Sequence, residues 1–443
     1  MNDMTLVLNP LRAAVAAGTP ATLEVLVRLQ APERPADSRR ARAPLHLAIV
    51  VDRSGSMSGQ PLAEARRCAH LVVDGLQAGD RAAVVAYDND VQTLCPLVGT
   101  ASRDRLRHAI DSITERGTTD LHGGWLAGAE ALAPHTGDHA LSRVILLSDG
   151  QANHGITGID TIAAHCAELA AAGVTTSTYG LGRSFNEALM TRMADAGLGN
   201  AYYGQTADDL ADPFNEELEL LAALCARDVR LDLTPARGVR VEVLNTCASL
   251  PDGGRRLPDV AFGGEAWALL RLTIDASVVP APTAHAQLLN ASVSWRGSEA
   301  GEHGSHAQAF SLPVLPAGEV AALAEDPLVR RRLAEVTVAR LQQEAHAAAR
   351  RRDWAAVEEA LRRAREASAS NPWLSGVVEE LEALAARRDE EMLAKESMYA
   401  SRRAMSRLAM VRESAGLEDE GDVPAFARRK RVQGRAGSSR GVS

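Results

Sequence analysis

The sequence predicts a multidomain α/β protein, and three patterns along its 443 residues indicate that fold class. Between residues 45 and 226, apolar strand runs alternate with helical patterns, which is typical of a mostly parallel sheet flanked by helices. Short strands of alternating polarity lie before residue 32 and after residue 226, as in an antiparallel sandwich. From residue 320 onward, apolar residues recur near the helical period. We therefore expect an α/β domain inserted in or followed by a β-sandwich, plus a C-terminal helical region.

The first strand pattern lies in residues 21–29, ATLEVLVRL. Alternate residues are apolar, which is the period-2 pattern of a half-buried strand. One face would carry Leu23, Val25, Val27 and Leu29, and the other Thr22, Glu24 and Arg28. A linker rich in proline and arginine, residues 31–44, follows this strand. We expect residues 1–32 to form part of the sandwich, with separate N-terminal strands as the alternative.

The segment 45–226 is predicted to form the α/β domain. Strands are expected at 45–51, 81–94, 143–148 and 174–182, and helices at 61–76, 105–113, 121–132, 160–173, 186–197 and 211–226. The motif YDND at residues 87–90 interrupts the second of these strand runs and predicts a hairpin there. One edge strand of the sheet should therefore be antiparallel to its neighbour.

The pattern of apolar residues changes after residue 226. Strands with alternating apolar residues are predicted at 228–235, 238–244 and 288–295, which places the β-sandwich at 227–316. Helical patterns at 325–353, 354–369 and 372–393 place a helical region at 320–413, either a packed bundle or a helical hairpin that resembles a tetratricopeptide repeat. The last segment, 414–443, is basic and poor in apolar residues, so we expect a disordered tail.

Composition excludes several classes of protein. A net charge of −9 argues against general nucleic-acid binding, because the chain as a whole repels phosphate. The first 394 residues contain no lysine, so the phosphate-binding lysine of a P-loop is absent, and the abundance of Ala and Arg is typical of a high-GC bacterial gene. The five cysteines are scattered and predict reduced thiols. With neither a signal-peptide pattern nor about 18 uninterrupted apolar residues, we expect a cytoplasmic protein outside the membrane.

Three segments carry side chains that could bind a divalent metal ion. In LHLAIVVDRSGSM, residues 45–57, an apolar run ends at Asp52 and is followed by Ser54 and Ser56. Thr119 lies in RGTTDLHGG, and Asp149 ends the apolar run VILLSD. Hydroxyl and carboxylate oxygens are the hard ligands that Mg²⁺ prefers. Because loops at the carboxyl ends of parallel strands form the binding crevice of open α/β sheets, these residues should lie together.

This pattern resembles the metal-ion-dependent adhesion site of the von Willebrand factor type A domain family, Asp-x-Ser-x-Ser followed by a distant Thr and a distant Asp. All five positions match. The resemblance implies a Rossmann-like domain in which Ser54, Ser56 and Thr119 bind the metal directly, while Asp52 and Asp149 act partly through bound water. It also implies that an open position on the metal accepts a carboxylate oxygen from an Asp or Glu of a partner protein. Mg²⁺ is the expected ion, with Mn²⁺ and Ca²⁺ as alternatives.

The function expected from these residues is a non-enzymatic protein–protein interaction module. An alternative is a scaffold or adaptor subunit of an ATP-driven assembly, such as a ring ATPase or a chelatase-like complex encoded nearby. Hydrolysis is less favoured, because the segment GSMSG at residues 55–59 places Met57 where a hydrolase elbow needs its nucleophilic serine. Partners are therefore expected to be proteins, with neither nucleic acid nor membrane among them.

Other polar residues near the predicted site have simpler interpretations. Asp120 could support the metal site indirectly or cap the following helix. Asp88 and Asp90 are expected to shape the hairpin rather than bind metal. His122 and His154 could contact a ligand near the site, but solvated loop histidines are the more common case.

Overall fold

The computed structural model describes residues 4–33, 43–136, 140–181, 185–204 and 210–386, except for positions 211–213, 216, 219–220, 222, 246, 251, 298–301 and 370. The described residues form two compact units. One contains the residues between 43 and 221, and the other combines residues 4–33 with those from 223 onward. The predicted basic tail at 414–443 and the end of the predicted helical region, 387–413, lie outside the described residues.

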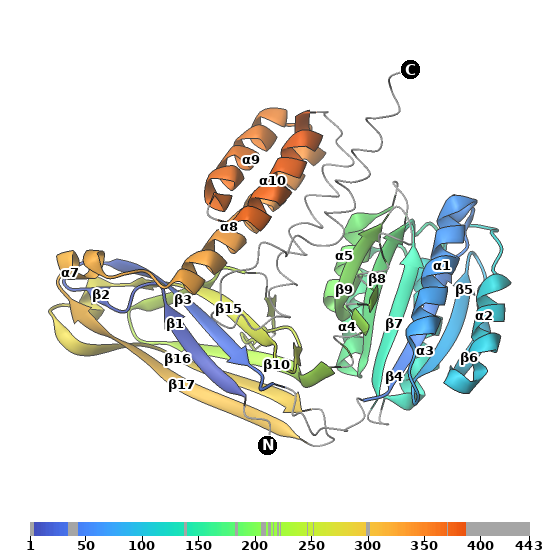
Figure 1. The fold of residues 1–443 in the computed structure, drawn as a ribbon, viewed down its shortest axis with the longest axis horizontal. Coiled ribbons are helices and arrows are strands. Elements are labelled where there is room, and N and C mark those ends of the chain that lie inside the picture. The colour runs from blue at the N-terminus through green and yellow to red at the C-terminus, as the bar shows by residue number, and fades with distance from the viewer. Residues whose placement is uncertain are drawn as a thin grey trace. The chain divides into compact units, whose positions relative to one another are not determined.

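The unit between residues 43 and 221 is built on a six-stranded sheet in the order β6-β5-β4-β7-β8-β9 (Figure 1). Its strands are β4 (Leu45–Asp52), β5 (Arg81–Tyr87), β6 (Val91–Gly99), β7 (Leu141–Ser148), β8 (Val174–Leu181) and β9 (Leu198–Gly204). All neighbouring strands are parallel except β5 and β6, so the predicted antiparallel hairpin at the edge is confirmed. Every residue of the central strand β4 is buried, as expected for a parallel sheet covered on both faces.

Helices beside this sheet begin and end close to their predicted bounds. They are α1 (Gln60–Gly75), α2 (Arg103–Asp111), α3 (Leu121–Leu132), α4 (Ile159–Ala171) and α5 (Glu187–Ala196), with short 3-10 turns at Gly55–Met57, Thr100–Ser102 and Ala133–His135. Helix α3 packs closely on the sheet at two glycines, where there is no room for a side chain. An added Cβ at Gly124 would lie 2.3 Å from the Tyr87 ring. An added Cβ at Gly128 would lie 2.4 Å from Val50. These two glycines therefore set the position of α3 and of the loop before it.

The second unit contains a sandwich of two sheets, ordered β1-β3-β15-β11 and β12-β13-β10-β16-β17-β2, with β14 paired to β10. The first sheet consists of β1 (Thr5–Pro10), β3 (Ala21–Gln30), β11 (Val239–Val243) and β15 (Glu265–Ile274). The second consists of β2 (Val15–Ala16), β10 (Leu224–Pro235), β12 (Ala248–Ser249), β13 (Arg255–Arg256), β14 (Val260–Ala261), β16 (Thr283–Gly297) and β17 (His303–Leu315). A short 3-10 turn lies at Ala276–Val278.

The pairing of β3 with β15 decides between the two predicted domain arrangements. These strands form an antiparallel ladder that runs from Ala21 opposite Ile274 to Gln30 opposite Glu265. A strand before the α/β unit thus lies beside a strand after it. The α/β domain is therefore inserted in the sandwich rather than followed by a separate one.

The end of the helix predicted at 211–226 is wrong. Phe214, Glu217 and Leu221 are helical, but β10 already begins at Leu224. Cys225 and Ala226 are buried in the sandwich core, where Ala226 pairs with Gly297 of β16. Burial in this core, together with the sheet hydrogen bonds, outweighs the helical preference of the alanine-rich sequence.

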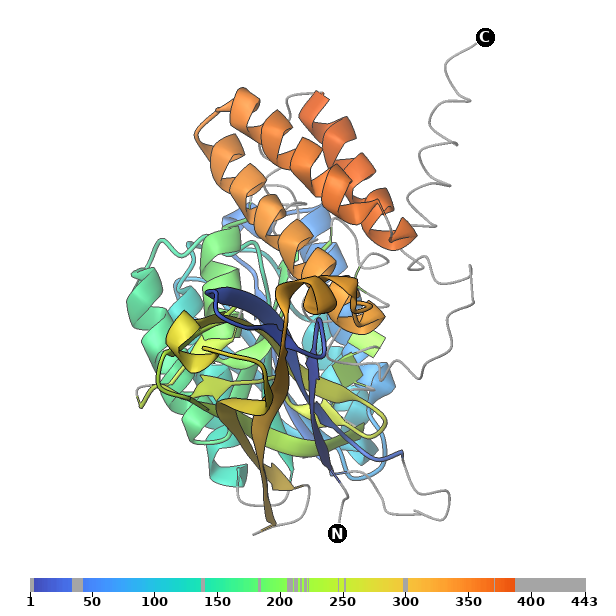
Figure 2. The same cartoon turned by 90° about the vertical axis from the view of Figure 1, so that its left-hand side faces the viewer.

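The sandwich core confirms the predicted inner face of β3, formed by Leu23, Val25, Val27 and Leu29. The other face of β3 is also covered, because Leu26 packs with Val329 and Val336 of the helical region. That region consists of α7 (Ala317–Ala322), α8 (Pro327–Arg350), α9 (Trp354–Ser368) and α10 (Pro372–Ala386). Figure 2 shows the last three helices side by side. Among the described residues, no helix is both long enough and apolar enough to cross a bilayer.

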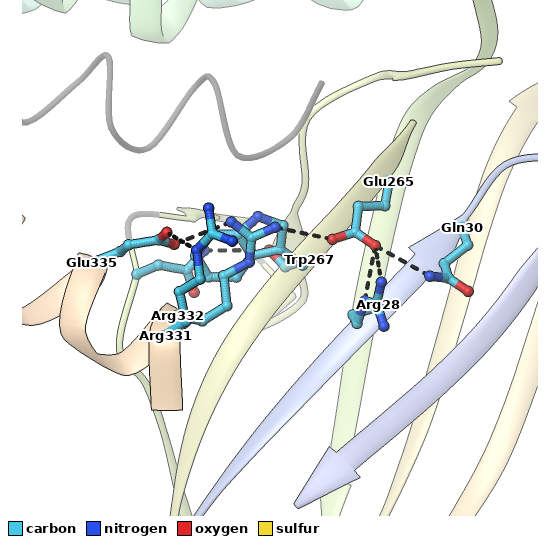
Figure 3. A network of polar contacts seen from close by, with 8 residues as sticks. Arg28, Gln30, Glu265, Trp267, Arg331, Arg332 and Glu335 are labelled. Carbon is cyan, nitrogen blue, oxygen red and sulfur yellow. Dashed lines mark hydrogen bonds and ion pairs between the residues drawn. The ribbon is translucent and has the colours of Figure 1, made fainter. Parts of the chain in front are cut away.

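Buried charges join α8 to the sandwich (Figure 3). Glu265 at the start of β15 accepts hydrogen bonds from Arg28 Nη2 at 2.6 Å and from Arg332 Nη2 at 3.2 Å. Arg332 also donates to Glu335 at 3.1 Å, and its guanidinium lies 5.0 Å from the centre of the Trp267 ring. Glu265 and Arg332 are both fully buried, so their charges depend on each other.

Replacing Arg332 by Met should lower the free energy of unfolding by about 3 kcal/mol, because Glu265 and Glu335 would each keep a buried charge with one partner fewer. Urea unfolding followed by tryptophan fluorescence measures this change. Arg362→Met is the matched control, since the ion pairs of Arg362 with Glu359 and Glu366 are exposed and their loss should leave stability almost unchanged. Equal unfolding midpoints for Arg332→Met and the wild type would contradict the role given to this network.

Candidate metal site

Asp52 is the last residue of β4 and is fully buried. Its carboxylate receives three hydrogen bonds from neighbouring segments. Ser148 Oγ, at the end of β7, donates to Oδ2 at 2.6 Å, and the Tyr87 hydroxyl, at the end of β5, donates to the same oxygen at 3.2 Å. The backbone N–H of Ser54 donates to Oδ1 at 2.9 Å. The carboxylate is thereby held at the carboxyl ends of three adjacent parallel strands.

Ser54 and Ser56 follow β4 in a tight turn that places their hydroxyls side by side, with 3.1 Å between the two Oγ atoms. Ser54 is buried, whereas Ser56 is exposed. The backbone N–H of Gly55 donates to the carbonyl oxygen of Gly117 at 3.1 Å. This bond joins the turn to the loop that carries Thr119.

Thr119 and Asp149 lie on two further loops that contact each other. Thr119 is buried directly before α3, and its N–H donates to Asn153 Oδ1 at 2.8 Å. Its carbonyl oxygen accepts the N–H groups of Asn153 and His154, both at 3.1 Å. Asp149 follows β7 next to Ser148 and is 7% exposed. The structure thus brings the loops of all five predicted residues to one edge of the sheet.

Among the described residues, the carboxylates of Asp52 and Asp149 have no basic ion-pair partner. Burial raises the pKa of Asp52 to about 6, and the negative charge of Asp149 adds to this effect, while the hydrogen bonds from Ser148 and Ser54 oppose it. In the part of the chain that the structure describes, no basic side chain forms an ion pair with Asp52 or Asp149. Two carboxylates among serine and threonine hydroxyls form a set of hard oxygen donors that fits a small divalent cation.

Arg53, which follows Asp52 in the sequence, forms an ion pair with Asp88. Arg53 Nε donates to Asp88 Oδ2 at 2.6 Å, and Arg116 Nε donates to the same oxygen at 2.9 Å. The other oxygen of Asp88 accepts the N–H of Asp90 at 2.8 Å, in agreement with the predicted role of this aspartate pair in the hairpin. Asp88 also joins the loops of Arg53 and Arg116, a role that the sequence analysis did not predict.

The remaining candidates have structural roles. Asp120 caps α3 by accepting the N–H of Gly123 at 2.9 Å, which agrees with one of its two predicted roles. His154 is exposed, as predicted, but the prediction for His122 was wrong. His122 lies in α3 and is 7% exposed, with its Nε2 atom 2.9 Å from Nδ1 of His165 in α4. The packing of α3 beside α4, which the sequence does not specify, buries it.

Three residues that support the site were missed: Tyr87, Ser148 and Asn153. Tyr87 and Ser148 each end a strand next to β4, so the signal was their position at the carboxyl end of an apolar run. Asn153 lies four residues after Asp149 in a polar loop, and no sequence pattern marks it. All three form hydrogen bonds with residues of the predicted set: Tyr87 and Ser148 donate to Asp52, and Asn153 accepts from Thr119.

Comparison with known proteins identifies the family of the α/β unit. The von Willebrand factor type A domain family matches residues 46–216. The uncharacterized protein YfbK of Escherichia coli K12 is 30% identical over 195 residues, which cover 43% of this chain and 34% of that protein. Human inter-alpha-trypsin inhibitor heavy chain H3 is 26% identical over 186 residues, which cover 40% of this chain and 21% of that protein. The chain thus spans only about a third or less of the length of these two relatives.

Two solved structures share the fold over almost the whole chain. A von Willebrand factor type A protein from Catenulispora acidiphila is 17% identical with a TM-score of 0.69, covering 92% of this chain and 97% of its own. The ArnB paralog VWA2 from Sulfolobus acidocaldarius is 18% identical with a TM-score of 0.60, covering 90% of this chain and 98% of its own. At these identities the likeness concerns the fold alone. Residues 46–216 of this chain form a von Willebrand factor type A domain.

Proposed function

We propose that the von Willebrand factor type A domain binds a divalent cation and, through it, an acidic side chain of a partner protein. One observation carries this proposal. A buried aspartate, Asp52, lies with a second carboxylate and three hydroxyl side chains at the edge of the sheet, and no basic side chain of the described residues neutralises it. A divalent cation would supply the missing positive charge.

The five residues have distinct roles in this proposal. Ser54, Ser56 and Thr119 offer neutral hydroxyl oxygens to the cation, while Asp52 and Asp149 supply negative charge and orient the hydroxyls. Because neutral hydroxyl groups neutralise little of the cation's charge, the cation can accept a further carboxylate oxygen from outside the protein. Ser56, the exposed member of the set, marks the side from which a partner would approach.

The proposed module is non-enzymatic, and its partner is recognised by an Asp or Glu. Mg²⁺ stays the predicted ion, with Mn²⁺ or Ca²⁺ as alternatives. A cytoplasmic location and a ring ATPase or chelatase-like partner also stay predictions from the sequence. The family of the domain supports the general role of protein–protein interaction.

Adding Mg²⁺ or Mn²⁺ to the chelator-treated protein should raise its thermal stability. A cation held only by the native state stabilises it by about 2.7 kcal/mol at about 100 times the dissociation constant. Differential scanning calorimetry of the wild type and of Asp149→Ala, each with metal or with chelator, measures the effect. The increase should vanish in Asp149→Ala.

Asp160→Ala is the matched control for this experiment. It removes a carboxylate from the same domain, but the Asp160 side chain is 96% exposed on α4 and lies outside the predicted set. This variant should keep the full response to metal. A response of equal size in Asp149→Ala and the wild type would place the cation elsewhere and contradict the proposal.

Peptides selected from a random library on the immobilised protein should contain a common Asp or Glu when Mg²⁺ is present and should lose this residue preference in chelator. Thr119→Val should abolish the preference, because it removes one hydroxyl oxygen while the hydrogen bonds of the Thr119 backbone remain. Sequencing of the recovered peptides gives the result. The same acidic preference in chelator and in metal would argue against recognition through a cation.

A further inference from the structure

A hollow of about 520 Å³ lies in the sandwich, on residues of β10, β13, β16 and β17. This volume is in the range of small-molecule sites. Its lining includes three arginines, Arg230, Arg256 and Arg296. All of these residues belong to the sandwich unit, so the hollow shares no residue with the candidate metal site.

The register of the sheet explains why these side chains meet. Arg230 pairs with Arg256 on one side and with Ser294 on the other, and Ser294 pairs with Ser305. Arg296 lies two residues beyond Ser294 on the same strand, and therefore on the same face. The neighbouring residues Leu231 and Val293 belong to the core, so the polar row occupies the outer face of the sheet.

Two arginines of this row share one carboxylate. Arg256 and Arg296 both form ion pairs with the single carboxylate of Asp228. Arg230 is paired with Asp232 and Asp252. Arg227 lies opposite Arg296 in the ladder, and no ion pair joins it to another described residue. Like charges opposite each other destabilise a sheet, and an anion placed between them would offset that cost.

The backbone at Asp228 is irregular. Its φ is 59°, in the left-handed region, and the ladder between β10 and β16 shifts register between Arg227 and Arg230. The N–H of Asp228 donates to Asp259 Oδ1 at 3.0 Å instead of to the ladder. This bulge turns the Asp228 carboxylate toward the guanidinium groups of Arg256 and Arg296, with which it forms ion pairs. Bulges and left-handed residues are frequent beside binding sites.

We propose that this hollow binds a small oxyanion, a carboxylate or a phosphate, through the guanidinium groups of Arg256 and Arg296. Guanidinium groups bind both chemistries through pairs of parallel N–H donors. Arg256 is partly buried, with 24% of its side chain exposed, so it would position the anion. Arg296 is 63% exposed and would exchange its ion pair with Asp228 for one with the anion. Asp228 holds both arginines when the anion is absent and competes with it.

Two substitutions should change the affinity in opposite directions. Isothermal titration calorimetry at low ionic strength, with inorganic phosphate and separately with citrate, measures the binding of each probe. Arg296→Gln should weaken binding about tenfold, because a charge-assisted hydrogen bond is lost. Asp228→Asn should strengthen binding, because it removes the competing charge while asparagine also tolerates the left-handed backbone. Binding of phosphate alone or of citrate alone would identify which oxyanion the site takes.

Arg240→Gln is the matched control, because Arg240 is 76% exposed on β11 of the other sheet and should leave the affinity unchanged. Circular dichroism checks that each variant is folded. Absence of binding by both probes would overturn the proposal. So would equal affinities in the wild type and Arg296→Gln, or weaker binding in Asp228→Asn.

Discussion

The hydrogen bond from Ser148 to the buried carboxylate of Asp52 is the constraint on which the candidate metal site depends. It joins the carboxyl ends of β4 and β7, two parallel neighbours, and so brings Asp149 beside the Asp52 turn. A buried carboxylate without such donors would be costly, because its charge has left water. Asp88 forms an ion pair with Arg53, which follows Asp52 in the sequence. The edge of the sheet therefore keeps a negative character that suits a cation.

The sandwich depends on contacts that are distant in the sequence. Its β3–β15 ladder joins residues on either side of the inserted domain, and the buried Glu265 receives hydrogen bonds from Arg28 of β3 and Arg332 of α8. Contacts of such long sequence separation form late, because the loop between them must close first. We infer that the inserted domain, whose sheet contacts are more local, can fold before the sandwich is complete.

The fold class could be predicted because it depends on local patterns of polarity, and the places of Asp52 and Asp149 could be predicted because each ends an apolar run. Strand β15 was missed because Trp267 and Leu269 pack against α8 on its outer face, so its sequence, EAWALLRLTI, does not alternate in polarity. Strand β9 was missed because LGNAYYG contains no apolar run. The roles of Tyr87 and Ser148 follow from strand order, and the burial of His122 follows from helix packing. A local pattern marks Tyr87 and Ser148 as the ends of apolar runs, but it gives neither the order of the strands nor the packing of the helices.

The central claim is that one divalent cation binds at the edge of the sheet between the loops of Asp52, Thr119 and Asp149. The most direct test is anomalous diffraction from crystals of the protein grown with Mn²⁺, compared with crystals of Ser54→Ala grown in the same way. We expect one strong manganese peak within bonding distance of the Ser54 and Ser56 hydroxyls, and we expect this peak to be lost in the variant. A manganese peak bound elsewhere, or an unchanged peak in Ser54→Ala, would contradict the central claim.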